Sequence, residues 1–309
     1  MKEAIGWMSE AFRQLSAGKV IVPQRIRMEL PSSAANMLIM PVAAPDVPVV
    51  AVKSVSIFGK NAERNLPLIH SLIQVFDAKS GEPLALLDGE YITALRTGAA
   101  GGLAAKLLAR KDARCAVIFG TGIQGQMQFR ALTEVCALER IYFINRTGKN
   151  LAGICQKLSR ETGLEVLPGT AGNVSEADII CTATTSRTPL FADASLKSGV
   201  HINSIGAYKP ELREIPLETL TRAKIFVGSR KACLAEDGDL TFARKCSPVT
   251  AESIPAEIGE LAAGKCAGRT SEKEITIFKS VGNAAQDLWT IHEVLQKASR
   301  QKLVRKVEI

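Results

Sequence analysis

Three glycines at a fixed spacing form the clearest chemical signature in this chain of 309 residues. Gly120, Gly122 and Gly125 fit the pattern Gly-x-Gly-x-x-Gly, and they come directly after an apolar strand expected at 115–119. The first glycine permits a tight turn, the second lets the backbone approach a pyrophosphate, and the third allows the next helix to pack on the strand. The pattern therefore predicts a dinucleotide site. We assign to it the consecutive residues Gly120, Thr121, Gly122, Ile123 and Gln124.

The residues after the next expected strand indicate which dinucleotide is bound. An acidic side chain at this point would bind the free 2′-hydroxyl of NADH, but this chain has Asn145, Arg146 and Thr147 after Ile144. A guanidinium and a hydroxyl can hold a 2′-phosphate, which a carboxylate would repel. The sequence therefore favours NADP(H) and leaves NAD(H) open. The alternative is that Arg146 only caps a surface turn.

Two cations stand where an unpaired charge would be costly. Lys53 lies on a strand expected at 49–58, and the period of two places it on one face with the apolar Ala51 and Val55. Arg96 lies near the start of a helix expected at 93–108, among alanines and glycines. A charged group in such surroundings needs a counter-ion. For either residue taken singly, a surface ion pair is an equally good explanation.

These residues belong to two kinds of predicted structure. After an amphipathic helix expected at 1–18, extended segments joined by turns indicate antiparallel β-structure up to residue 87. From residue 115 onward, short apolar strands alternate with helices, which indicates a parallel, doubly wound sheet. A strand expected at 275–278 and a helix expected at 284–300 complete the pattern.

Composition limits the classes of partner. A net charge of +8 suits anionic ligands, but only 5% of the residues are aromatic and the cations are spread along the chain, so we expect no nucleic-acid partner. No apolar run reaches the roughly 20 residues of a membrane span, so we expect a cytoplasmic protein with no membrane partner. Seven scattered cysteines and three widely separated histidines indicate neither disulfides nor a metal site.

Motifs from both regions together resemble the ornithine cyclodeaminase and mu-crystallin family. The matching segments extend through nearly the whole chain and comprise Pro23-x-Arg25, Met40-Pro41, Lys53, Ala94 to Thr97, Gly120 to Gly122, Asn145 to Thr147, His201 to Gly206, Gly238-Asp239 and Phe278 to Gly282. The resemblance implies an α/β fold with a Rossmann doubly wound domain at 98–280. It also implies a discontinuous α+β domain, formed by 1–97 and 281–309, that binds the substrate and forms a homodimer.

The resemblance assigns a substrate site to the discontinuous domain. Members of the family reduce imines of α-keto acids with a nicotinamide cofactor, or oxidise the corresponding amino acid. The expected ligands of the substrate carboxylate are Arg25, Lys53 and Arg96, since a planar guanidinium can bind a carboxylate through two hydrogen bonds. Met40 and His70 are expected beside them, although a lone histidine is as often structural.

The resemblance also names catalytic and cofactor-binding residues. Asp239 is expected beside the substrate nitrogen as a general acid or base, and the alternative is an ordinary Gly-Asp turn. The expected catalytic residues are Asp239 and Lys53. The cations that bind the carboxylate are expected to orient the substrate toward the nicotinamide. The remaining expected cofactor contacts are Thr97, Asn145, Arg146, Thr147, Thr182, Thr184, Ser204, Gly206 and Lys279.

One departure from the cyclodeaminase pattern narrows the substrate. Ornithine cyclodeaminases have an acidic residue two positions before Met-Pro, and here that position is Leu38. An apolar side chain cannot stabilise a distal ammonium, so we expect reduction of a cyclic ketimine, Δ1-pyrroline-2-carboxylate or Δ1-piperideine-2-carboxylate, to L-proline or L-pipecolate. The alternatives are ornithine cyclodeaminase and alanine dehydrogenase of the same fold. A protein that binds NADPH and a small ligand without turnover is an alternative of another class.

Overall fold

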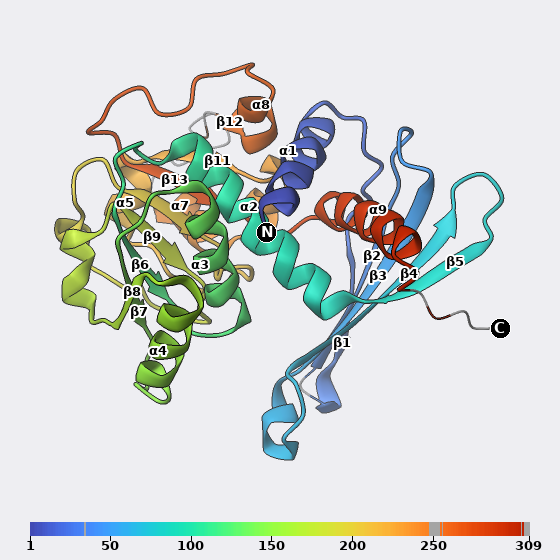
Figure 1. Cartoon of the computed structure of the whole chain (residues 1–309), viewed down its shortest axis with the longest axis horizontal. Helices are drawn as coiled ribbons and strands as arrows, with labels where there is room; N and C mark the ends of the chain where they lie inside the picture. The colour runs from blue at the N-terminus through green and yellow to red at the C-terminus, as the bar shows by residue number, and fades with distance from the viewer. Residues whose placement is uncertain (34, 247–253, 255, 304, 306–309) are drawn as a thin grey trace. The chain divides into compact units, whose positions relative to one another are not determined.

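The computed structural model describes residues 1–309 except 34, 247–253, 255, 304 and 306–309 (Figure 1). Contacts between residues divide the chain into two units, each containing one β-sheet. Residues 1–16 and 97–283 form the parallel unit, and residues 17–96 and 284–309 form the antiparallel unit. Helix α2 (Gly89–Leu108) contributes residues to both units.

The antiparallel unit contains a five-stranded sheet in the order β1-β2-β3-β4-β5. Its strands and its last helix are β1 (Ile26–Leu30), β2 (Ala35–Val42), β3 (Val49–Phe58), β4 (Ile69–Asp77), β5 (Pro83–Asp88) and α9 (Ala284–Arg300). Burial alternates along β3 because one face of the sheet packs against α9, while the other face is more exposed (Figure 1).

The parallel unit contains an eight-stranded sheet in the order β12-β11-β13-β10-β9-β6-β7-β8, and its strand pairs are all parallel. Its strands are β6 (Cys115–Phe119), β7 (Arg140–Ile144), β8 (Glu165–Pro168), β9 (Ile179–Thr182), β10 (His201–Ser204), β11 (Lys224–Val227), β12 (Ala256–Glu257) and β13 (Thr276–Lys279). Its helices are α1 (Lys2–Ser16), α3 (Ile123–Val135), α4 (Leu151–Thr162), α5 (Leu217–Arg222), α6 (Arg230–Glu236), α7 (Gly238–Cys246), α8 (Ile258–Ala262) and the second half of α2.

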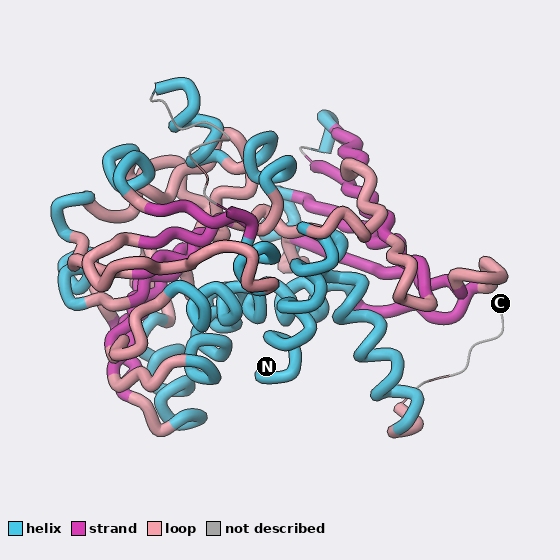
Figure 2. The backbone as a smooth tube through the Cα atoms, turned by 90° about the horizontal axis from the view of Figure 1, so that it is seen from above, coloured by secondary structure: helices cyan, strands magenta, loops and turns pink. Residues whose placement is uncertain are grey.

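Helices lie on both sides of the parallel sheet (Figure 2). Apolar side chains on both faces of the sheet explain these two layers. On one face, Ile118 belongs to a buried cluster with Phe129 of α3 and Leu158 of α4. On the other face, Val117 belongs to a cluster with Leu240 of α7. The chain passes from β8 across β6 to β9, so the order of strands reverses between β6 and β9. The structure therefore confirms the predicted α/β class, with a doubly wound Rossmann sheet and a second α+β unit.

Small residues let α2 pack closely inside the parallel unit. A Cβ atom on Gly98 would lie 2.7 Å from the Cβ of Met127 in α3, and one on Gly102 would lie 2.9 Å from Ile5 of α1. The ring of Phe12 in α1 also meets Phe278 of β13 edge-on, with the centroids 6.3 Å apart. Helix α1 therefore groups with the parallel sheet, whereas the sequence-based boundary placed it with the antiparallel segments.

No helix among the described residues combines the length and the apolarity needed to cross a bilayer.

Candidate active site

The glycine turn leaves space and hydrogen-bond donors for a pyrophosphate. Gly120 has a φ of +105°, and a Cβ atom on it would overlap the carbonyl oxygen of Ala183. A Cβ atom on Gly125 would overlap the carbonyl oxygen of Gly120, so the start of α3 packs directly on the turn. Gly122 has no atom within 4 Å of its Cβ position and gives α3 no side-chain cap. The first N–H groups of α3 thus have no side-chain cap, and a bound phosphate could accept hydrogen bonds from them.

Two more features of the turn suit a dinucleotide. The side-chain oxygen Oε1 of Gln124 is buried and accepts no hydrogen bond from any described residue, which leaves an acceptor for a ligand hydroxyl. Asn145, at the end of β7, donates from Nδ2 to Thr121 Oγ1 (3.2 Å) and to the carbonyl oxygen of Lys149 (3.1 Å). The two loops that follow β6 and β7 are therefore held together.

The two residues after Asn145 are available to a ligand. Arg146 and Thr147 are exposed, and the Thr147 hydroxyl accepts a hydrogen bond from the backbone N–H of Lys149. Within the described ranges, the Arg146 guanidinium makes neither an ion pair nor a hydrogen bond. A cation in this position can bind an anion without first breaking an existing bond.

A buried carboxylate that sequence reasoning missed connects the loops after β9 and β10. Glu214 accepts hydrogen bonds from the Thr182 hydroxyl (2.8 Å), from the backbone N–H and hydroxyl of Thr184 (2.7 Å each) and from the backbone N–H of Gly206 (2.9 Å). Burial raises the pKa of Glu214, and these donors oppose that effect. Three expected cofactor-binding residues are thus fixed by one side chain at the carboxyl edge of the parallel sheet.

Lys279 and two carboxylates form a second buried network at this edge. The Lys279 ammonium donates to Asp239 Oδ2 (2.7 Å) and Ser204 Oγ (2.8 Å), and lies 3.1 Å from Asp237 Oδ2. Burial disfavours the ammonium, but the charges of Asp237 and Asp239 outweigh it and raise the pKa of Lys279. Burial also raises the pKa of Asp237 to about 6, although Lys279 opposes this rise. This group is called the lysine–aspartate network below.

The network determines what Asp239 can do. Its Oδ1 accepts hydrogen bonds from the backbone N–H groups of Glu214 (2.9 Å) and Ile215 (3.2 Å), while its Oδ2 binds Lys279, and the residue has no exposed surface. These contacts occupy both oxygens of the carboxyl group and hold the backbone of residues 214–215. The family resemblance predicts Asp239 beside the substrate nitrogen. In the structure its carboxylate forms a buried ion pair with Lys279, and Asp237 binds the same ammonium.

The cations expected to bind the substrate meet in the antiparallel unit. Lys53 of β3 and Arg96 of α2 both bind Asp287 of α9, at 2.7 Å (Nζ to Oδ2) and 3.1 Å (Nε to Oδ1). Lys53 also donates to the Thr93 hydroxyl (3.3 Å), and Arg96 Nη1 donates to Gln286 Oε1 (3.3 Å). The structure therefore brings Lys53 and Arg96 together, with Asp287 as the counter-ion that both residues required.

The electrostatics of this cation cluster favour release of a proton from Lys53. Burial lowers the pKa of Lys53 to about 8, against the attraction of Asp287, and the charges of Arg96 and Arg25 lower it further. Arg25, half-buried in the segment before β1, is therefore close enough for its charge to act on Lys53. Lys53 and Arg96 share the single carboxylate of Asp287, so this buried pair keeps a positive excess for an anionic ligand.

The other expected substrate residues divide between the two faces of the antiparallel sheet. Met40 pairs with Lys53 in the register of β2 and β3, and Leu38 lies two positions away on the same buried face. His70 pairs with Ser56 and so belongs to the opposite face, where its ring lies 3.2 Å from Glu90. The structure does not bring His70 together with the cation cluster.

The sequence contains a signal that Asp287 is a buried carboxylate in need of a cation. Residues 284–291 of α9 are all buried, and Asp287 lies among them with the apolar Ala284, Leu288 and Ile291. A carboxylate on the apolar side of an amphipathic helix needs a cation, just as Lys53 needs an anion. No local pattern distinguishes Glu214, because three of its four donors belong to Thr182 and Thr184, about thirty residues before it in the sequence.

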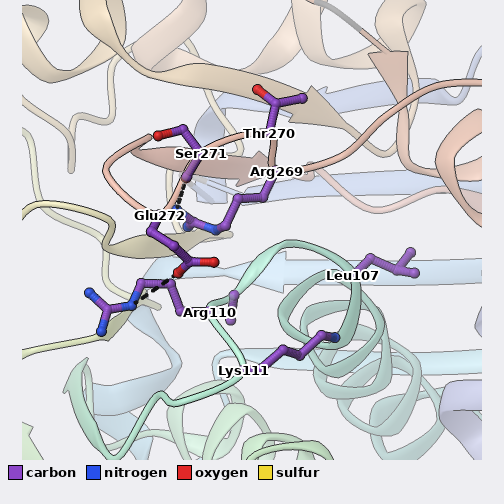
Figure 3. Close-up of a pocket in the computed structure, with 8 residues that line it drawn as sticks. Leu107, Arg110, Lys111, Arg269, Thr270, Ser271 and Glu272 are labelled. Atoms are coloured by element: carbon purple, nitrogen blue, oxygen red, sulfur yellow. Dashed lines mark hydrogen bonds and ion pairs between the residues drawn. The ribbon is translucent and has the colours of Figure 1, made fainter.

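A hollow of about 320 Å³ lies elsewhere in the parallel unit (Figure 3). Residues 107, 109–111 and 269–272 line it. These segments precede β6 and β13, so the hollow is at the amino edge of the sheet. Its arginines already have partners: Arg110 binds Asp112 (2.6 Å) and lies 3.6 Å from Glu272, while Arg269 donates to the carbonyl oxygens of residues around it. Ligands of open α/β sheets bind at the carboxyl edge, where the glycine turn lies.

Comparison with known proteins shows which family the whole chain resembles. The model of the ornithine cyclodeaminase/mu-crystallin family matches residues 1–302. A Δ1-pyrroline-2-carboxylate reductase from Bacillus thuringiensis subsp. konkukian is 35% identical over 311 positions, which cover 100% of this chain and 95% of that protein. The structure of the Thermococcus litoralis Δ1-pyrroline-2-carboxylate reductase in complex with NADH and L-proline has a TM-score of 0.95 and 36% identity, covering 99% of this chain and 96% of that one. An archaeal alanine dehydrogenase dimer with bound NAD has a TM-score of 0.94 and 32% identity, covering 100% and 95%. The chain therefore belongs to the ornithine cyclodeaminase/mu-crystallin family.

Proposed function

We propose that this protein reduces a cyclic ketimine, Δ1-pyrroline-2-carboxylate or Δ1-piperideine-2-carboxylate, to L-proline or L-pipecolate with a nicotinamide cofactor. The observation that carries the proposal is the buried pair of Lys53 and Arg96, which shares one internal carboxylate and retains a positive excess. Such a site suits a small carboxylate. The reductases of Bacillus thuringiensis and Thermococcus litoralis, similar along the whole chain, support the same reaction.

In the proposed reaction the substrate carboxylate binds Arg25, Arg96 and Lys53, and its ring lies against the apolar side chains of Leu38 and Met40. The reduced nicotinamide, when bound, supplies a hydride to the imine carbon. The imine nitrogen needs a proton, and we assign its delivery to Lys53, since a pKa of about 8 is close to a neutral working pH.

Asp239 has a positioning role in this proposal. Because it is ion-paired with Lys279 and holds two backbone N–H groups, it keeps the carboxyl edge of the parallel sheet in place. The cofactor contacts assigned to Thr182, Thr184, Ser204 and Gly206 depend on that edge.

Leu38 favours this reaction over ornithine cyclodeamination. It is 7% exposed and lies on the face of Lys53, with Val55 opposite it in the next strand. Leu38 itself offers no carboxylate to a distal substrate ammonium. Alanine dehydrogenation is the second candidate, because the archaeal alanine dehydrogenase has nearly the same TM-score as the reductase.

NADP(H) is the proposed cofactor, in preference to NAD(H). The exposed Arg146 guanidinium and Thr147 hydroxyl follow β7, where a 2′-phosphate would lie in a Rossmann fold. The solved relatives contain NADH and NAD, so the proposed preference for NADP(H) rests on Arg146 and Thr147 of this chain and not on the relatives. We also assign the protein to the cytoplasm, where its seven free thiols would stay reduced.

The exposed face of the antiparallel sheet supports a homodimer. Large apolar side chains lie on the face opposite Lys53, and their exposed fractions are 62% for Ile26, 47% for Met28, 53% for Leu72 and 64% for Leu86. A monomer rarely exposes such a patch to water. We propose that a second copy of this chain covers it.

Steady-state reduction tests the function. Oxidation of NADPH and of NADH is followed with Δ1-pyrroline-2-carboxylate, with Δ1-piperideine-2-carboxylate and with pyruvate plus ammonia, and ornithine is tested with NAD. We expect the highest kcat/KM for a cyclic ketimine. Arg96→Met should raise KM at least tenfold, whereas Arg64→Met, at an exposed residue, should not change it. Turnover of ornithine or pyruvate in preference to both ketimines would refute the proposal, and cofactor binding without turnover of any substrate would indicate a binding protein.

A further inference from the structure

We propose that Asp287 is a positioning residue of the substrate site, which orients Lys53 and Arg96 and keeps Lys53 protonated at neutral pH. The inference deepens the proposed function and rests on it for the identity of the substrate. It concerns a residue of the last helix, far in sequence from the cations it binds.

The geometry places Asp287 between the two cations. Its two oxygens bind different partners, Oδ2 at 2.7 Å from Lys53 Nζ and Oδ1 at 3.1 Å from Arg96 Nε. The three residues are 1%, 2% and 6% exposed, in the order Asp287, Lys53 and Arg96, so water does not screen the pair. They come from α9, β3 and α2, and hence Asp287 fixes the side chains of two other elements. Its place in the first turn of α9 also favours a negative charge.

The neighbouring charges explain why one carboxylate is required. The charged groups that act on Lys53 are Asp287 from α9, Arg96 from α2 and Arg25 from the segment before β1, and Thr93 of α2 adds a hydroxyl. Two of these groups are cations, and burial adds to their effect. Asp287 is the group that opposes them. Without it, Lys53 would lose its proton at a lower pH and could neither bind a carboxylate as an ammonium nor deliver a proton.

The first measurement uses the ligand-free protein and needs no substrate. Lys53 has a pKa of about 8 in the folded chain against 10.5 as a model group. Between these values the unfolded state binds more protons, so stability rises with pH in this window. Asp287→Asn should lower the folded-state pKa of Lys53 by at least about one unit, a tenfold change in its proton-binding constant. The destabilisation by Asp287→Asn should therefore be larger at pH 7 than at pH 9.5.

Two controls isolate the Lys53 effect in these urea unfolding curves. Asp46→Asn removes one negative charge from an exposed position of the same unit and should show no pH-dependent difference from the unmodified chain. The substitution Lys53→Met should abolish the pH dependence of the Asp287→Asn effect, because the titrating group is then missing. An equal destabilisation at pH 7 and pH 9.5 would overturn the inference.

The second measurement is the pH profile of ketimine reduction. We expect the plot of kcat/KM against pH for the unmodified protein to have an alkaline limb near pH 8, where kcat/KM falls as pH rises. The limb of Asp287→Asn should lie at least one pH unit lower. In this variant KM should be raised more than kcat is reduced. Asp287→Glu should restore most of the shift. A limb that does not move would overturn the inference even if ketimine is reduced. If no ketimine is reduced but the unfolding curves behave as described, the proposed function fails and the role of Asp287 toward Lys53 stands.

Discussion

Removal of the Lys279 ammonium should destabilise the parallel unit strongly, and in a way that depends on pH. In Lys279→Met two buried carboxylates, Asp237 and Asp239, lose the cation that lies 3.1 and 2.7 Å from them. The three side chains are at most 1% exposed, so water cannot replace the lost contacts. Removing one partner of a buried ion pair costs about 3–5 kcal/mol. We expect a loss of about 4 kcal/mol at pH 7.5, which is a large part of the stability of a typical domain.

The loss should be smaller in acid. The pKa of Asp237 is already raised to about 6 from 3.8, mainly by burial, and the charge of Lys279 opposes this rise. Without Lys279 the pKa of Asp237 rises further, so the folded state keeps its proton to a higher pH than the unfolded state does. Stability then falls as pH rises through this window. If the pKa of Asp237 rises by one unit, the loss at pH 5.5 should be about 1 kcal/mol smaller than at pH 7.5.

The two tryptophans of the chain allow each unit to be followed by itself. Trp7 lies in α1 of the parallel unit and Trp289 in α9 of the antiparallel unit, so Trp7 fluorescence in a Trp289→Phe background reports the parallel unit. Urea unfolding is measured at pH 5.5 and 7.5 for Lys279→Met and for Lys273→Met, whose side chain is exposed. A loss below about 1 kcal/mol at pH 7.5, or a loss equal at both pH values, would show that the network does not carry the buried charge assigned to it.

Three further predictions concern the cofactor site and the exposed sheet face. Arg146→Ala should weaken NADPH binding about tenfold or more and leave NADH binding unchanged, because only NADPH has a 2′-phosphate; fluorescence titration checks this, and equal effects on both would contradict it. Gly125→Ala should abolish binding of either cofactor in the same titration, since its Cβ would overlap the carbonyl oxygen of Gly120, and retained binding would show that the turn is not the site. Leu86→Glu should convert the proposed dimer to a monomer in light scattering, since it buries a charge at the proposed interface, whereas an unchanged mass would exclude this face.

Most regular elements could be predicted because their own sequence determines them. The strands at 49–58 and 115–119 and the helix at 284–300 have the expected bounds, since alternation or apolar periodicity covers their whole length. The short helix α7 was not predicted. Its acidic start appeared typical of a turn, and contacts with distant segments determine its position: a Cβ on Gly238 would overlap the carbonyl oxygens of Lys209 and Leu212.

The part of the candidate site that could be predicted is the part whose sequence pattern lies within a single segment. The glycine turn has its strand, its spacing and its helix within a dozen residues, and it has the expected geometry. The partners of buried charges were not predictable, since Lys53 and Asp287 are separated by more than two hundred positions. The sequence indicated that Lys53 needs an anion, but only the fold identifies it. For the same reason the pairing of Asp239 with Lys279 could not be foreseen.

Two lysines of this protein show why residue type and burial do not determine a chemical role. Lys53 and Lys279 are both at most 2% exposed, and burial alone would lower the pKa of each. Lys279 faces two carboxylates, so its pKa is raised and it remains an ammonium at any physiological pH. Lys53 faces one carboxylate and two cations, so its pKa falls to about 8. A group can exchange a proton during turnover only if its two forms have similar free energies at the working pH. Lys53 meets this condition and Lys279 does not, which is why we propose that Lys53 delivers the proton and that Lys279 has a structural role.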